Sequence, residues 1–117
     1  MSGTVRAVRG ATGVRADTRQ DIRTATEDLV RELLGHNGLA AADVEALFFT
    51  VTPDLTADIP PLVLQERGVL NVPCLCSAEP RWDGEMPRVI RVMALVHADR
   101  DASLEPVYLS GAAATRP

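Results

Sequence analysis

The sequence predicts an α+β fold, a mixed five-stranded sheet with one long helix on one face. One segment has a sustained helical repeat of apolar residues, and five short segments are apolar, β-branched or alternating. The chain has 117 residues, the usual size of one domain, so we expect residues 1–117 to form a single domain. One helix of about 18 residues cannot cover both faces of five strands, so we expect the other face to pack against another copy of the chain.

The first half of the chain contains a strand, the long helix and a second strand. Thr4–Gly10 alternates and predicts a strand, with a turn at the Ala-Thr-Gly that follows. Thr18 is the expected helix N-cap, and Asp21 completes an acidic version of the capping box. The apolar run Ala46–Thr52 fits a buried strand. The buried stripe of the helix, which ends near Gly35, is formed by Ile22, Ala25, Leu29, Val30, Leu33 and Leu34.

The second half predicts a short helix and three more strands. Asp58 is the expected N-cap of the short helix, because prolines suit the first turn that follows, and Gly68 ends it. The strongest strand has apolar or β-branched residues at nearly every position. The three expected strands are Val72–Ser77, Arg88–His97 and Pro106–Leu109.

The charged residues exclude several classes of function. Twelve basic and sixteen acidic side chains leave a net charge of −4, and the two signs are interspersed. There is no basic stripe to follow a phosphate backbone, so we expect no nucleic-acid partner. All twelve basic residues are arginine. The absence of lysine excludes Schiff-base catalysis, pyridoxal phosphate attachment and a P-loop lysine.

The apolar runs and the cysteines indicate a cytoplasmic protein without a metal. The longest apolar runs are a few residues, far short of the roughly 18 that a membrane span needs, and no signal peptide is visible. Cys74 and Cys76 are too close in sequence to bridge readily, so nothing points to an oxidising compartment. Only His36 and His97 are available to join them around zinc, and their spacing suggests no site.

Four polar residues stand near strand centres or ends. Arg91 lies within the most apolar strand, where a guanidinium needs a carboxylate, a ligand or solvent. Arg9 ends a strand beside a glycine, Glu79 is placed to pair with Arg91 across the sheet, and Tyr108 is the only tyrosine. Each also has an ordinary interpretation as an exposed arginine, a surface carboxylate or a core tyrosine. Together they suit a pocket for an anionic substrate that carries carboxylates.

Five stretches in register resemble the AroH-class monofunctional chorismate mutases. They are Val8-Arg9-Gly10-Ala11-Thr12, Thr52-Pro53-Asp54-Leu55, Val72-Pro73 with Glu79, Ile90-Arg91-Val92-Met93, and Val107-Tyr108-Leu109 with Arg116-Pro117. The resemblance implies conversion of chorismate to prephenate in aromatic amino-acid biosynthesis, by a Claisen rearrangement that needs no cofactor. It also implies a homotrimer, a pseudo-α/β barrel with active sites at the subunit interfaces.

The same resemblance implies roles for individual residues. Arg91, Glu79 and Arg9 are the expected catalytic residues, with Arg91 at the ether oxygen of the substrate. Arg9 and Tyr108 would hold a carboxylate, while Glu79 and Cys76 would engage the ring hydroxyl. The remaining residues expected to contact substrate are Arg116, Ile59, Cys74 and Leu75.

One departure and two alternatives accompany this interpretation. Leu62 and Gln65 stand where many relatives carry basic residues, so the rim of the pocket is expected to be less basic than the family pattern. One alternative function is a trimeric imine deaminase-like enzyme of similar shape. The other is a non-catalytic regulatory module that binds a metabolite of the aromatic pathway, and loss of chorismate absorbance separates it from an enzyme.

Overall fold

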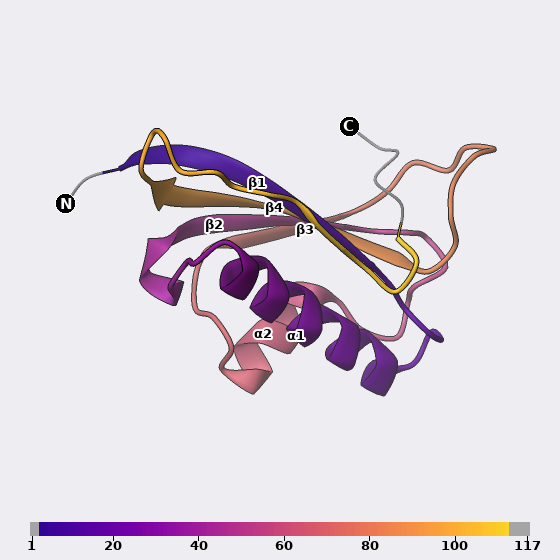
Figure 1. Ribbon diagram of the computed structural model, residues 1–117. Coiled ribbons are helices and arrows are strands. Elements are labelled where there is room, and N and C mark those ends of the chain that lie inside the picture. Colours follow the sequence, from indigo (N-terminus) through magenta and orange to yellow (C-terminus); the bar gives the residue numbers. More distant parts are fainter. Residues whose placement is uncertain (1–2, 113–117) are drawn as a thin grey trace.

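The computed structural model describes residues 3–112 and confirms the α+β class with a mixed sheet of five strands (Figure 1). A single 3-10 turn, Ala41–Asp43, precedes the second strand. The elements are β1 (Thr4–Gly13), α1 (Arg19–His36), β2 (Val44–Val51), α2 (Pro60–Arg67), β3 (Cys74–Ala78), β4 (Val89–Ala98) and β5 (Val107–Leu109).

The sheet has the strand order β3-β2-β4-β1-β5, with β4 at its centre. β4 runs antiparallel to both β1 and β2, whereas the edge strands β5 and β3 run parallel to β1 and β2. The most apolar segment of the sequence therefore forms the central strand, where both edges pair with neighbouring strands and one face lies beneath the helices.

Both helices lie on the same face of the sheet (Figure 1). The predicted long helix and the predicted short helix both form, and the short α2 packs beside α1, so that α1 does not cover this face alone. Four residues of the predicted stripe, Ile22, Leu29, Val30 and Leu33, are buried, whereas Ala25 and Leu34 are partly buried. The stripe meets buried side chains of β2 and β4, including Phe49, Ile90 and Val96. Within residues 3–112, no helix is long and apolar enough to cross a membrane.

The first strand is longer than expected. The segment Ala11-Thr12-Gly13, predicted as a turn, continues β1, with Thr12 paired to Ile90 on one side and to Leu109 on the other. Pairing on both edges satisfies the backbone groups that a turn would otherwise expose. A Cβ at Gly13 would collide with the carbonyl oxygen of Ser110, so the glycine permits close approach of the chain after β5.

The caps of the two helices follow the predictions in part. Thr18 caps α1 as expected, accepting the N–H of Asp21 at 3.0 Å. Asp58 is not the N-cap of α2, because Ile59 occupies that position and Asp58 precedes it. Oδ1 of Asp58 accepts the N–H of Ile59 at 2.8 Å. Gly68 ends α2 in the left-handed conformation, with a φ of 63°.

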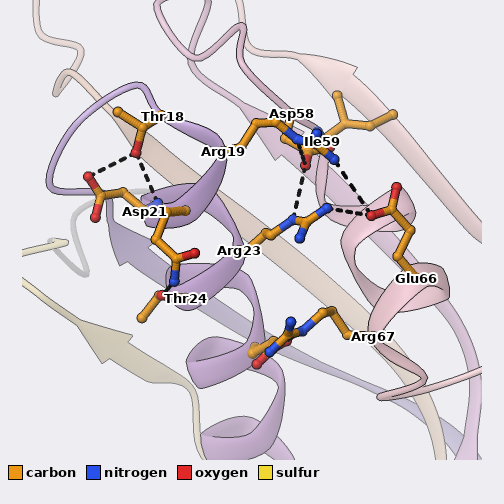
Figure 2. Close-up of polar contacts among 11 residues, drawn as sticks. Thr18, Arg19, Asp21, Arg23, Thr24, Asp58, Ile59, Glu66 and Arg67 are labelled. Carbon is orange, nitrogen blue, oxygen red and sulfur yellow. Dashed lines mark hydrogen bonds and ion pairs between the residues drawn. The ribbon is translucent and has the colours of Figure 1, made fainter.

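A cluster of four charges joins α2 to α1 (Figure 2). The Nε atoms of Arg19 and Arg23, one turn apart on α1, lie 3.5 and 3.7 Å from Oδ2 of Asp58. Glu66 on α2 contacts both arginines. The Asp58 side chain is only 7% exposed, so these ion pairs compensate its desolvation. The cluster holds the N-terminal end of α2, and with it Ile59, against α1.

Asp17 makes stability depend on pH. Its carboxylate accepts the N–H of Ala57 at 3.0 Å and the N–H and hydroxyl of Thr56, each at 2.9 Å. These bonds, led by the Ala57 N–H, lower the pKa of Asp17 below its ordinary value of 3.8. A lowered folded-state pKa contributes stability above the ordinary value and loses it as the pH falls through the folded value.

We therefore expect Asp17→Ala to lower the free energy of unfolding by a constant amount near neutral pH and by a shrinking amount below pH 3.8. Urea unfolding of both proteins across this range measures the difference. A difference that stays constant well below pH 3.8 would show that the charge of Asp17 contributes nothing.

Candidate active site

The central strand presents one of its two sides to the face that carries no helix. Ile90, Val92, Ala94 and Val96 are almost fully buried beneath the helices. Side chains alternate along a strand, so Arg91, Met93, Leu95 and His97 point to the opposite side. We call this opposite side the helix-free face, since neither α1 nor α2 covers it (Figure 1).

One line of residues crosses four strands on the helix-free face. Tyr108 on β5 pairs with Ala11 on β1, Ala11 pairs with Arg91 on β4, and Arg91 pairs with Thr50 on β2. Neighbouring strands are about 4.8 Å apart, which places Tyr108 and Arg91 roughly 10 Å apart, with only the small Ala11 between them. We call this line the polar row.

A second line, next to the polar row, is mostly apolar. It joins Arg9 on β1 to Met93 on β4, Phe48 on β2 and Leu75 on β3. Met93, Phe48 and Leu75 are 40%, 37% and 66% exposed, which is unusual for large apolar side chains gathered on one surface. Arg9 is the only charged member of this line and is exposed beside them.

A cavity of about 470 Å³ spans both lines and brings the two predicted arginines together. Its walls combine cationic, hydroxyl and apolar groups, which is the composition of a site for a small organic anion. The lining residues are Ala7, Arg9, Phe48, Thr50, Arg91, Val92 and Met93.

Glu79 and Arg91 form the buried ion pair that the sequence analysis expected. Nε of Arg91 lies 3.0 Å from Oε2 of Glu79, and the two side chains are 19% and 6% exposed. The hydroxyl of Thr50 donates to the same carboxylate oxygen at 2.8 Å. The N–H of Glu79 donates to the carbonyl of Val51 at 2.8 Å, which anchors its backbone to β2. These contacts compensate the desolvation of a carboxylate that is this deeply buried.

The geometry of the pair is that of a charge contact. Nε of Arg91 is buried and makes no hydrogen bond to any residue in the part of the chain that the structure describes. Its short distance to Glu79 reflects attraction between opposite charges without an aligned N–H···O bond. The guanidinium is therefore held beside the cavity by charge.

A second set of contacts sets the register of this site. The Thr52 hydroxyl accepts the N–H of Val89 at 3.0 Å and donates to Asp54 at 2.6 Å. Asp54 in turn accepts the N–H of Arg88 at 3.0 Å. These bonds tie the end of β2 to the start of β4, two residues from Thr50 and Arg91 respectively, and so keep those two opposite each other.

The two cysteines lie on the helix-covered face. Cys74 and Cys76 pair with Leu47 and Phe49 and pack against the core beneath the helices. Both are free, and burial raises the pKa of each thiol, so both are protonated at neutral pH. Leu75 between them points to the helix-free face. A single chain therefore does not bring Cys74 or Cys76 to the cavity that Arg91 lines.

The other predicted site residues are placed as follows. Tyr108 is half-buried and packs against Ala11, Val89 and Ala112. Ile59 is 41% exposed at the N-terminus of α2, on the helix side of the molecule. Arg116 lies outside the described residues. Leu62 and Gln65, expected at the rim, are exposed on α2.

Thr50 is the polar residue lining the cavity that sequence reasoning missed. It lies in an apolar strand, where its hydroxyl passes as an ordinary β-branched position. The sequence could have indicated Thr50 because side chains alternate along a strand, so its hydroxyl lies on the side of β2 opposite the buried Phe49. For metals, residues 3–112 contain no group of three or more His, Cys, Asp or Glu side chains that could hold an ion.

Comparisons with known proteins identify the family of this chain. The model of the family chorismate mutase type I matches residues 5–117. The chain is 39% identical over 115 residues to chorismate mutase AroH of Thermus thermophilus, covering 97% of this chain and 94% of that protein. It is 33% identical over 115 residues to chorismate mutase AroH of Bacillus subtilis strain 168, covering 97% and 91%.

A solved structure is also similar. A chorismate mutase from Clostridium thermocellum superimposes with a TM-score of 0.85 and 37% identity, covering 92% of this chain and 97% of that one. The resemblance recognised in the sequence is confirmed by the family model, by both relatives and by this structure. The chain belongs to the type I chorismate mutase family of isomerases.

Proposed function

We propose that this protein converts chorismate to prephenate, in aromatic amino-acid biosynthesis, by orienting the substrate and stabilising charge in the transition state. The observation that carries the proposal is the buried Glu79–Arg91 pair beside a cavity that also contains Arg9. Family membership and relatives named chorismate mutase support the same reaction.

Orientation is the first task of the site. The reaction is an intramolecular Claisen rearrangement, so it requires no nucleophile, general base or cofactor. The protein has to hold the enolpyruvyl group over the ring, and fixing a reactive geometry of this kind removes a large part of a barrier. Arg9 and Tyr108 supply the guanidinium and the phenol that would hold a carboxylate. The apolar Phe48 and Met93 shape the rest of the cavity.

Charge stabilisation is the second task. The carbon–oxygen bond breaks ahead of carbon–carbon bond formation, so negative charge develops on the ether oxygen. Arg91 is the donor proposed for that oxygen, since a preorganised cation in a partly dry site stabilises developing charge. Glu79 keeps the guanidinium in place and, with the neutral Cys76 thiol of a neighbouring chain, would engage the ring hydroxyl.

The division of the site residues supports a trimer with shared sites. Arg9, Glu79, Arg91 and Tyr108 belong to the helix-free face, whereas Ile59, Cys74 and Cys76 belong to the opposite side near α2 and β3. One chain cannot turn both groups toward one ligand. We propose that three chains form a pseudo-α/β barrel in which a neighbour's α2 and β3 complete each site and the helix-free face becomes buried.

The direct test is a chorismate assay. Purified protein is expected to remove the ultraviolet absorbance of chorismate and to form prephenate, with and without a chelator present. Binding of chorismate without consumption would instead identify a regulatory module and would contradict the proposed function. The cytoplasmic location expected from the sequence stays a prediction.

A further inference from the structure

Thr50 carries a hydroxyl at a strand position where the β-strand itself requires none. β2 reads VEALFFTV, and valine would suit position 50 equally well, because both side chains are β-branched and similar in shape. A half-buried hydroxyl facing a partly apolar cavity is costly unless it has a partner. The Thr50 hydroxyl has one, since it donates to Oε2 of Glu79 at 2.8 Å.

The carboxylate of Glu79 contacts side chains from two strands of the site. Its Oε2 atom receives the Thr50 hydroxyl from β2 and lies 3.0 Å from Nε of Arg91 on β4. Thr50 and Arg91 are direct partners in the β2–β4 register. Glu79 enters from the residue after β3, so its carboxylate bridges two residues that already face each other across the sheet.

The backbone alone does not hold that carboxylate in place. The N–H of Glu79 is anchored to Val51, but three side-chain torsions separate this anchor from the carboxylate. Nε of Arg91 attracts this carboxylate by charge at 3.0 Å but makes no aligned hydrogen bond to it, so this contact constrains direction less than a hydrogen bond does. The Thr50 hydroxyl bond is directional and selects one rotamer of Glu79.

We propose that Thr50 is a positioning residue of the active site: its hydroxyl fixes the Glu79 carboxylate, which in turn fixes the Arg91 guanidinium. The consequence for catalysis rests on the proposed function. A preorganised cation contributes most to the transition state, so loss of the hydroxyl lowers kcat more than it changes KM. A hydrogen bond to a charged group accounts for an effect of about tenfold or more in kcat.

The experiment compares Thr50→Val, which keeps the shape, with Thr50→Ser, which keeps the hydroxyl. Thr50→Val is expected to lose about tenfold or more in kcat, and Thr50→Ser to retain most of it. Thr4→Val is the matched control, because Thr4 is an exposed threonine at the start of β1 and is not among the residues that line the cavity. That variant is expected to keep the parent kcat.

A double-mutant cycle shows whether Thr50 acts through Glu79. In a Glu79→Ala background, Thr50→Val is expected to have little further effect on kcat or on the free energy of unfolding. Unchanged kcat in Thr50→Val, or effects of the two substitutions that simply add, would overturn the proposal. The unfolding cycle needs no substrate, so it tests the Thr50–Glu79 coupling even if the unmodified protein fails to consume chorismate, which would refute the proposed function instead.

Discussion

Arg91→Ala is expected to lower kcat by about three orders of magnitude, with a smaller change in KM. Removal of one preorganised donor from developing negative charge typically costs about 10²–10³ in rate, and Arg91 carries a full charge in a site where its side chain is only 19% exposed. The interaction strengthens as the ether bond breaks, so it acts mainly in the transition state. Steady-state kinetics with chorismate measures both constants.

Lysine at this position is expected to recover only part of the lost rate. A lysine ammonium is a point charge, whereas the planar guanidinium of Arg91 can contact Glu79 and the substrate together. Arg100→Ala, at an exposed position beyond β4, is the matched loss of an arginine and is expected to leave kcat unchanged.

Stability is measured in parallel, because Arg91→Ala removes the cation beside the buried Glu79 carboxylate. Breaking a buried pair from one side costs about 3–5 kcal/mol in general. The double variant Arg91→Ala with Glu79→Gln removes both charges, so it should regain stability while remaining slow. A folded, assembled Arg91→Ala protein with kcat within about tenfold of the parent would refute the electrostatic role.

Leu95→Asp is expected to convert the proposed trimer into monomers and to abolish activity. Leu95 lies on the helix-free face of the central strand, between Ala7 and Ala46, and is not itself among the residues that line the cavity, although Ala7 is. It is half-buried in one chain, so an isolated chain can hydrate an aspartate there. Burying an unpaired carboxylate in an assembly costs several kcal/mol for each chain. Light scattering gives the mass and the chorismate assay gives the rate.

Leu95→Met is the control for this variant, since a volume-conserving apolar exchange costs little. It is expected to keep both mass and rate. A Leu95→Asp protein that is monomeric, folded by circular dichroism and fully active would disprove the shared site and leave the assignment of the reaction intact. A parent protein that is monomeric at assay concentration would disprove the trimer itself.

Local patterns in the sequence were sufficient to predict most helices and strands. Residues a few positions apart predict three features: the helical repeat from Ile22 to Leu34, the Thr18 cap and the end of α2 at Gly68. The structure confirms all three. The wrong predictions concern segments whose conformation depends on residues distant in the sequence. Ala11–Gly13 looks like a turn in isolation, yet it becomes strand because β4 and β5 pair with it from both sides. Asp58 looks like a cap, yet Arg19 and Arg23 draw its carboxylate toward α1.

The candidate site was predictable only in part. The pairing of Glu79 with Arg91 was one of the outcomes expected, because a guanidinium within an apolar strand needs a carboxylate, a ligand or solvent. Thr50 was not foreseen, since a threonine in a strand is ordinary until its partner is known. The roles of the site residues came from resemblance to a family.

The sequence by itself determined the class of fold, the order of its elements and the family, because periodicity, caps and short motifs are properties of neighbouring residues. Tertiary structure alone decided which residues share a face. The β2–β4 register sets Thr50 opposite Arg91, and the β2–β3 register turns Cys74 and Cys76 away from the cavity. A shift of one residue in either register would exchange the two faces, and pairing between strands tens of residues apart is what selects the register.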